Sequence, residues 1–237
     1  MTGVRSMPNA DAVAVVRLER PPAFADAAVI HRTPISAEAR GLARDFCRRV
    51  GQEANRLNEQ AIGEPLRHRV ERYPDRRPRE SMLRDLERRW RDAQPQQFRL
   101  QFHCAWQGKN VFMTERAVTV LTAFRLPHWD ANDYGVEVVD TWLHVSRRKV
   151  DAGMRSRMWI GSHALARWYQ RSGARSDARL LHDIAIGAAV DPSDREAFPH
   201  LDDVHVPVGV AASWRGAIMM APETDDDELV LYVKTFI

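Results

Sequence analysis

The chain has 237 residues, of which 44% are hydrophobic and 28% are charged, so it can bury a core and is neither fibrous nor wholly disordered. Its two cysteines are too few for a disulfide scaffold or a four-cysteine zinc site. No stretch approaches the roughly 18 apolar residues of a membrane helix, and residues 1–11 lack the apolar run of a secretory signal. We therefore expect a soluble, cytoplasmic protein with no membrane partner.

The net charge of +3 is unevenly distributed along the chain. Residues 144–179 contain nine basic residues and two acids, whereas residues 183–228 contain eleven acids and two arginines. A basic block of this kind attracts phosphate-bearing ligands, so RNA is one expected partner. The alternative is a solvated basic face that pairs with the acidic segment of the same chain.

The N-terminal part begins with a predicted arm and continues as a long helix. Residues 1–35 look loosely structured, with one candidate strand at 12–18. Ser36 is a plausible N-cap, because apolar residues recur behind it at steps of three and four. This helix is expected to end near Gly63 and Pro65.

An arginine-rich segment with two prolines follows at residues 67–79 and predicts a solvated linker. A second helix is expected over residues 79–90. Beyond it the apolar period changes to two, which is typical of strands. The predicted strands are 98–106, 111–114, 117–126 and 136–145, with a turn at 107–110 and an interruption at Glu115-Arg116.

The C-terminal third is predicted to contain two helices and then three strands. The helices run from a cap at Ser162 to Arg171, and from a cap at Ser176 to about Ala189. The strands, 204–210, 214–220 and 229–236, complete an antiparallel meander.

The predicted fold class is therefore α+β, with N-terminal helices and strands followed by a helix–helix–β-meander unit. The order of the elements divides the chain into three parts. These are a flexible arm (1–35), a helical and β-containing region (36–149) and a candidate catalytic domain (150–237).

The first helix of that candidate domain carries a polar face. At about 100° per residue, one face collects His163, Arg167, Gln170 and Arg171. His163 lies in the first turn, where the helix dipole disfavours a protonated imidazole. A neutral histidine beside two arginines can act as a general base next to a phosphate clamp. The alternative is an ordinary amphipathic helix whose polar face is only solvated.

The pattern Ser162-His163-Ala164-Leu165-x-Arg167-x-x-x-Arg171 resembles the His-Ala-x-x-Arg-x-x-x-Arg helix in toxin-like domains of the barnase–EndoU–colicin–RelE class of small RNases. In that class one or two helices precede an antiparallel sheet, and a hydroxyl residue on a late strand completes the site. The resemblance covers about residues 156–237. It implies metal-independent RNA cleavage by 2′-hydroxyl transesterification, with no cofactor.

The same resemblance implies roles for four residues. His163 would be the general base, Arg167 and Arg171 the phosphate clamp, and Thr235 a hydroxyl that positions the phosphate. The further candidates for substrate binding are Trp214, Arg215 and Gln170. A protein partner of the antitoxin or immunity type, or a second copy of the chain, is a further expectation.

Two metal-site alternatives stay open. His200, Asp202 and His205, with Asp203 between them, offer imidazole and carboxylate ligands within six residues. The order His163, His182-Asp183 and a later Asp202 or Asp203 resembles that of metal-dependent phosphohydrolases.

Cys104 follows His103 in the sequence, and the two could be interpreted as a nucleophile and its general base. Adjacent strand residues face opposite sides of a sheet, however, so Cys104 is predicted to be a core residue. Among the tryptophans, Trp106, Trp142 and Trp168 are predicted core anchors. Trp129 and Trp214 border turns and could stack a base.

The sequence contains no glycine-rich phosphate loop, nucleophile elbow or dinucleotide fingerprint, so ATP- or NAD-dependent chemistry is not expected. The second functional hypothesis is a non-catalytic nucleic-acid- or protein-binding regulatory protein of a phage or mobile element. In that case the long helix behind Ser36 would supply a dimer or partner face. Its exposed residues are mixed in charge, which favours contact with protein over contact with DNA.

Overall fold

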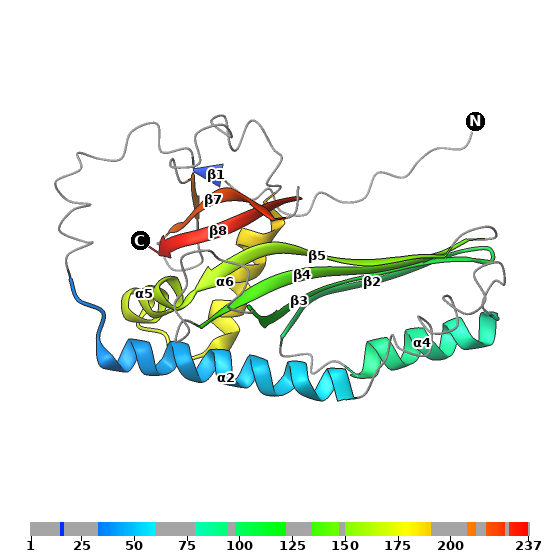
Figure 1. Cartoon of the computed structure of the whole chain (residues 1–237), viewed down its shortest axis with the longest axis horizontal. Coiled ribbons are helices and arrows are strands. Elements are labelled where there is room, and N and C mark those ends of the chain that lie inside the picture. The colour runs from blue at the N-terminus through cyan, green and yellow to red at the C-terminus, as the bar shows by residue number, and fades with distance from the viewer. Residues whose placement is uncertain are drawn as a thin grey trace.

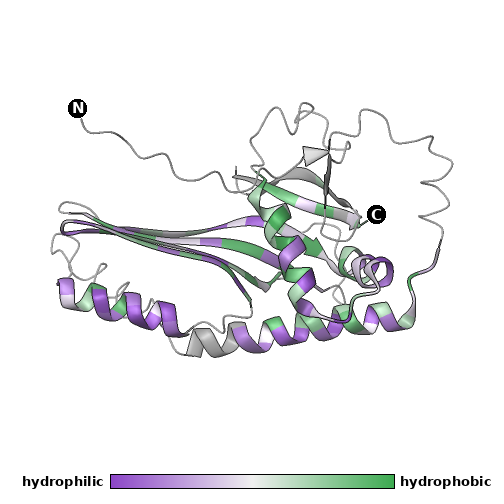
Figure 2. Ribbon diagram, turned by 180° about the vertical axis from the view of Figure 1, so that it is seen from behind, coloured by the Kyte–Doolittle hydropathy of each residue, from purple (hydrophilic) through white to green (hydrophobic). Residues whose placement is uncertain are grey.

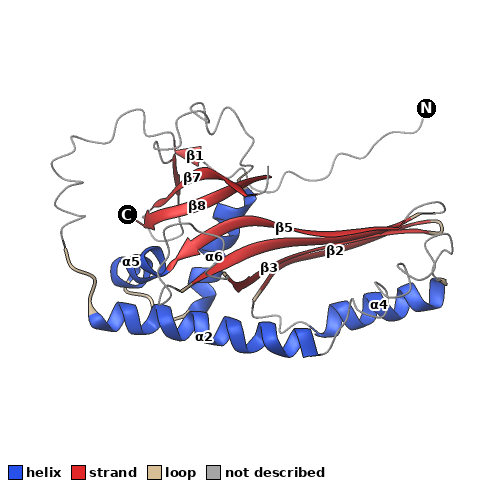
Figure 3. Cartoon of the chain, in the orientation of Figure 1, coloured by secondary structure: helices blue, strands red, loops and turns tan. Residues whose placement is uncertain are grey.

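The computed structural model describes four helices and eight strands (Figures 1 and 3). The described residues are 15–16, 33–59, 79–93, 98–121, 134–146, 150–190, 208–211, 217–225 and 228–236. The helices are α2 (Ala37–Glu59), α4 (Glu80–Ala93), α5 (Ser162–Ser172) and α6 (Asp177–Ala189). The strands are β1 (Val15–Val16), β2 (Arg99–Gln107), β3 (Asn110–Val120), β4 (Gly135–Val145), β5 (Val150–Gly161), β6 (Val208–Ala211), β7 (Ala217–Asp225) and β8 (Glu228–Phe236). The predicted α+β class is confirmed.

All described strands belong to one sheet, in the order β1-β6-β7-β8-β5-β4-β3-β2. Every neighbouring pair is antiparallel except β5 and β8, which pair in parallel. The predicted C-terminal meander is confirmed as β6–β7–β8. The predicted boundary at residue 150 falls between β4 and β5, which pair along their length. The sheet thus passes through both units, and their independent folding stays a prediction.

Two strand predictions were wrong. Strand β5 was not predicted, although Val150, Ala152 and Met154 alternate with Asp151, Gly153 and Arg155 in its first half. The interruption predicted at Glu115-Arg116 does not occur, since β3 runs through both residues. Partners from distant segments neutralise these two charges: Arg99 for Glu115 and Asp140 for Arg116.

Helix α2 begins where the sequence predicts. The Ser36 hydroxyl oxygen accepts the backbone N–H of Ala39 at 3.1 Å, which satisfies a free donor of the first turn. Its buried stripe consists of Ala39, Ala43, Phe46, Cys47 and Val50. Phe46 packs edge-on against Phe98, with ring centroids 6.0 Å apart. The predicted helix end near Gly63, most of the arm and most of the linker lie outside the described residues.

Helix α4 is amphipathic, and its ribbon alternates between hydrophilic and hydrophobic residues (Figure 2). Leu83, Leu86 and Trp90 are buried against the sheet, while Met82 is half-buried. Their partners on β3 and β4 are Val111, Met113, Leu143 and Val145. Trp106 and Cys104 of β2 are half-buried and pack against the same cluster, so they lie at the edge of the core in which they were predicted.

The long strands turn different faces toward the two N-terminal helices. Strands β3 and β4 pair without a bulge from Val111↔Val145 to Val120↔Val136, so alternate residues keep to one face throughout. Helix α4 packs against odd-numbered residues of these strands. The core that includes α2 and α5 takes even-numbered ones, among them Val118 and Val138. The helices nevertheless lie end to end along one side of the molecule (Figure 1), which a strongly twisted sheet permits.

A buried ion pair joins the end of α4 to the sheet. Arg99 Nε donates to Glu115 Oε1 at 2.6 Å, and Trp90 Nε1 donates to Glu115 Oε2 at 2.5 Å. The side chains of Arg99 and Glu115 are 10% and 6% exposed. Arg99 also donates to the carbonyl oxygens of Trp90 and Arg91, which are free acceptors of the last helical turn. One guanidinium thus holds the helix terminus and the buried carboxylate together.

Replacing Arg99 should destabilise the protein strongly. We expect Arg99→Ala to lower the free energy of unfolding by about 3–5 kcal/mol, because it leaves the Glu115 carboxylate buried without its cation. Urea denaturation followed by circular dichroism measures this change. Arg88→Ala, which removes an exposed partner of Asp85, is the control and should have little effect. Equal effects of the two substitutions would contradict the structural role of Arg99.

Candidate functional site

The predicted catalytic helix forms as α5 but starts differently. Gly161 is the N-cap, Ser162 is the first helical residue, and no side chain caps the helix. The helix ends at Gly173, whose φ of 60° lies in the left-handed region that glycine adopts without strain. The predicted cap at Ser162 was therefore wrong by one residue, and the helix itself is confirmed.

The polar face of α5 is mostly covered by the chain itself. His163 is exposed, but Arg167 is only 4% exposed and its Nη1 donates to the carbonyl oxygen of Thr33 at 2.6 Å. Gln170 Nε2 donates to the carbonyl oxygen of Pro34 at 3.1 Å. The segment that leads into α2 therefore lies against two of the four residues predicted to share this face.

Arg171 bonds to the chain in the same manner. Its Nη1 donates to the carbonyl oxygen of Phe236 on β8. Burial and, to a smaller extent, the positive charge of Arg167 lower the pKa of Arg171. Both predicted clamp arginines thus bond to backbone carbonyls, and α5 is held to β8 and to residues 33–34.

A bulge moves Thr235 away from α5. Met220 pairs with Val233 but Met219 pairs with Thr235, so β8 carries one extra residue between them. Phe236 packs on Trp168 of α5, with ring centroids 6.3 Å apart. Thr235 therefore faces the opposite side of the sheet, where it is buried and its Oγ1 has no hydrogen-bond partner in the described part of the chain.

The four predicted catalytic residues are accordingly not assembled around one point. His163 stands on the outside of α5, Arg167 and Arg171 bond to carbonyls, and Thr235 lies across the sheet. Simple alternation along β8 would have placed Thr235 with Val233 on the side of α5, and the bulge is the reason that it does not.

Other predicted site residues lie outside the described residues. These are Trp214, Arg215, Trp129, His200, Asp202, Asp203 and His205. Within the described residues, no group of three His, Cys, Asp or Glu side chains could hold a metal ion. Asp183, a member of the phosphohydrolase-like order, is buried and accepts the indole N–H of Trp168 at 2.7 Å.

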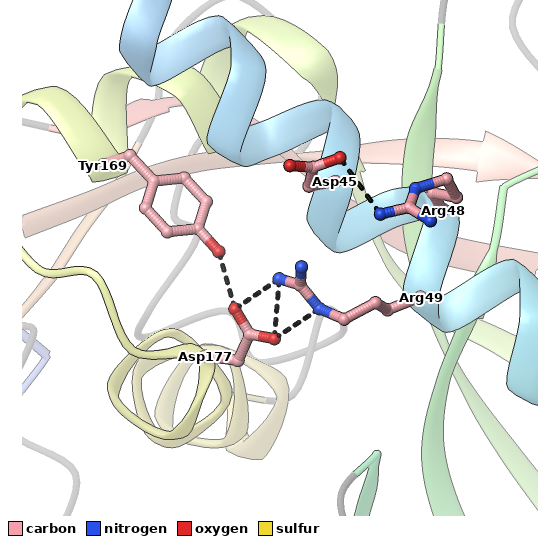
Figure 4. A network of polar contacts seen from close by, with 5 residues as sticks. All are labelled: Asp45, Arg48, Arg49, Tyr169 and Asp177. Atoms are coloured by element: carbon pink, nitrogen blue, oxygen red, sulfur yellow. Dashed lines mark hydrogen bonds and ion pairs between the residues drawn. The ribbon is translucent and has the colours of Figure 1, made fainter.

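A polar network ties α2, α5 and α6 together (Figure 4). Arg49 donates two hydrogen bonds to the Asp177 carboxylate, at 3.0 and 2.8 Å, and the Tyr169 hydroxyl donates to it at 3.1 Å. Burial raises the pKa of Tyr169, and the adjacent Asp177 raises it further. In the same view Arg48 bonds to Asp45 on the exposed side of α2. The network is structural, since its members bond to one another.

Much of the basic block of residues 144–179 is likewise bonded within the chain. Arg157 donates to the carbonyl oxygens of Ala188 and Val190 at the end of α6. Arg175 pairs with Glu38 of α2. With Arg167 and Arg171, four of the nine basic residues make such bonds. The acceptors are backbone carbonyls and Glu38 and not carboxylates of residues 183–228, so the pairing of the basic block with the acidic segment stays a prediction.

A hollow of about 620 Å³, which was not predicted, lies on the even-numbered face of β3 and β4, near the β2–β3 turn. We call this surface the open face, because α2, α4, α5 and α6 pack elsewhere on the sheet. Three rows of cross-strand neighbours make up the open face. They are Phe112–His144–Asp151, Thr114–Trp142–Gly153 and Arg116–Asp140–Arg155.

Each row of the open face has its own chemistry. The Phe112 and His144 rings meet edge-on with centroids 6.0 Å apart. The Trp142 indole lies over Gly153, where a Cβ atom would come within 2.3 Å of the ring. Trp142 is therefore half-buried on the open face and not the core anchor that was predicted, whereas Trp168 is fully buried as predicted.

The ionic row contains two arginines and one carboxylate. Arg116 donates to both oxygens of Asp140, at 2.6 and 2.9 Å. Arg155 Nη2 lies 3.9 Å from Asp140 Oδ2, beyond hydrogen-bond distance. The sequence placed charges at these positions but gave no signal for the face on which they lie, because that depends on the pairing of β3, β4 and β5.

The cysteines do not supply a nucleophile. Burial raises the pKa of Cys47 to about 12 and, together with the Glu87 carboxylate, that of Cys104 to about 11. Both thiols therefore stay protonated at neutral pH. This agrees with the prediction that Cys104 is a core residue.

Comparison of the chain with protein-family models, with curated proteins and with solved structures finds no match.

The contacts of α5 predict effects of different size on stability for substitutions at two of its polar residues. Arg167→Ala should lower the free energy of unfolding by about 1–3 kcal/mol, because it removes a buried, charged hydrogen-bond donor. His163→Ala, at an exposed position of the same helix, should change it by about 0.5 kcal/mol or less. Thermal and urea unfolding of both variants measure the difference. If Arg167→Ala left the free energy of unfolding unchanged, the structural role of Arg167 would be contradicted.

Proposed function

We propose that this chain is a non-catalytic interaction protein that binds a partner protein on its open face. The observation that carries the proposal is the hollow itself, with Phe112 42% exposed at one end and Arg155 48% exposed at the other. Aromatic and arginine side chains are enriched where proteins bind one another. Neither side chain has a role in the core.

The charges of the open face favour a protein over a nucleic acid. The open face carries two arginines, Arg116 and Arg155, and two aspartates, Asp140 and Asp151. Binding to nucleic acid needs a surplus of positive charge, because most of its affinity comes from contacts with phosphates. A balanced set of charges beside aromatic rings is instead typical of a protein interface.

RNA cleavage stays a prediction with weaker support. A transesterification site needs its base and its clamp around a single phosphate. Here Arg167 and Arg171 already donate to backbone carbonyls, and Thr235 faces the other side of the sheet. The exposed imidazole of His163 is the one predicted catalytic group in the described chain that a substrate could reach directly.

Incubation of the purified protein with total RNA in EDTA separates the two functions. We expect no fragments with 2′,3′-cyclic phosphate ends, because no clamp is assembled beside His163. His163→Ala is the matched variant, since the exposed position should tolerate it. Cleavage by the wild type that disappears in His163→Ala would overturn the proposal and establish the nuclease.

Two exposed hydrophobic residues provide the binding test. Phe112 lies on the open face, and Met154, 65% exposed, pairs with Thr141 on the opposite face. Random peptides displayed on phage are selected on the wild-type protein and then tested on two variants. Phe112→Lys should weaken binding of the selected peptides by about tenfold or more, since it replaces an exposed aromatic contact by a charge. Met154→Lys should bind them like the wild type. Peptides that ignore Phe112→Lys would contradict the proposal.

A further inference from the structure

We infer that the open face recognises an extended acidic segment, with a carboxylate of the partner on Arg155 and an apolar or aromatic side chain on Trp142. This inference rests on the proposed function and names the chemistry of the partner. It follows from three features of the open face: the unused donors of Arg155, the indole held on Gly153, and the spacing of the rows.

Arg155 has hydrogen-bonding capacity that the described chain does not use. The Asp140 carboxylate already accepts two bonds from Arg116, and Arg155 stays 3.9 Å away. Two guanidinium groups thus share one carboxylate, which leaves a positive charge at this end of the hollow. A second carboxylate, supplied by a partner, could accept two parallel hydrogen bonds from Arg155 in a bidentate pair.

The Trp142 ring is held in place one row from Arg155. Its indole is fixed against the backbone at Gly153, because any Cβ there would overlap the ring. The ring also lines the hollow, together with Phe112 and His144. An apolar or aromatic side chain of a partner can pack on this ring with little loss of entropy, since the ring is already held in place.

The spacing of the rows fits an extended peptide. Arg155, Trp142 and Phe112 lie on the neighbouring strands β5, β4 and β3, each one row further along the sheet, so they form a diagonal with steps of about 7–8 Å. An extended partner repeats its same-side residues every 6.6–6.8 Å or about that, and long side chains such as Arg and Trp span the small difference. A segment that crosses the strands along this diagonal and places Asp or Glu on Arg155 therefore brings its residue two positions away to Trp142, and its residue four positions away to Phe112. The expected motif is an acid, any residue, and then an apolar or aromatic residue.

The test uses the full-length protein and the displayed random peptides. Selection on the wild type should enrich Asp or Glu two positions from an apolar or aromatic residue. Arg155→Glu should weaken these peptides by about tenfold or more, because it replaces a charge-assisted bond by repulsion. A fresh selection on Arg155→Glu should exchange the acid for Lys or Arg and keep the apolar position. Arg88→Glu, the same charge change on α4, should leave binding unaltered.

The outcomes separate this inference from the proposed function. The acidic motif is overturned if the selected peptides depend on Phe112 but contain no acid, or if selection on Arg155→Glu does not exchange the acid for Lys or Arg. The proposed interaction function would remain in either case. If no selected peptide depends on Phe112, both fail. Binding of a uridine oligonucleotide that depends on Arg155 would identify phosphate as the anion, and self-association lost in Phe112→Lys would identify a second copy. Either result overturns the acidic-segment inference.

Discussion

The unbroken pairing of β3 with β4 is the constraint on which the rest of the structure depends. Ten residue pairs in constant register, from Val111↔Val145 to Val120↔Val136, fix which side chains share a face. Odd-numbered residues meet α4 at one end of the sheet, and even-numbered residues meet α2 and α5 at the other. The open face is a consequence of this register. At the end of the sheet where α4 packs on the odd-numbered face, no described helix packs on the even-numbered face. A shift by one residue would bury Arg116 and expose Met113.

Several arginines of the described chain connect one element to another. Arg99, Arg157 and Arg171 each donate to backbone carbonyls of another element, and Arg49 binds the carboxylate that begins α6. A guanidinium suits this task because it carries five donors and remains charged when partly buried. The desolvation of each cation is offset only when several bonds form at once, which is why Arg99 has three acceptors.

Local patterns predicted the elements well, and long-range pairing decided the rest. The cap at Ser36, the apolar stripe behind it and the alternation of β2 depend on near neighbours, so the sequence alone indicates them. Strand β5 was missed because it carries the charged residues Asp151, Arg155 and Arg157. The groups that the two arginines approach, Asp140 and the carbonyls at the end of α6, belong to other elements. The side of the sheet on which Thr235 lies was not predictable either, since the alternation of residues along β8 does not reveal a bulge.

The contrast between α5 and the open face shows why charge counted along a sequence overstates binding to anions. An arginine bonded to a carbonyl keeps its charge, but part of its donors and its freedom of movement are already used. The basic block therefore offers a phosphate fewer donors than its composition suggests. On the open face, the pairing of β4 with β3 fixes the Arg116–Asp140 bonds, and its pairing with β5 holds the Trp142 ring on Gly153, before any partner arrives. Groups that are already ordered lose little entropy on binding, so the open face is better suited to recognition than the more basic helix α5.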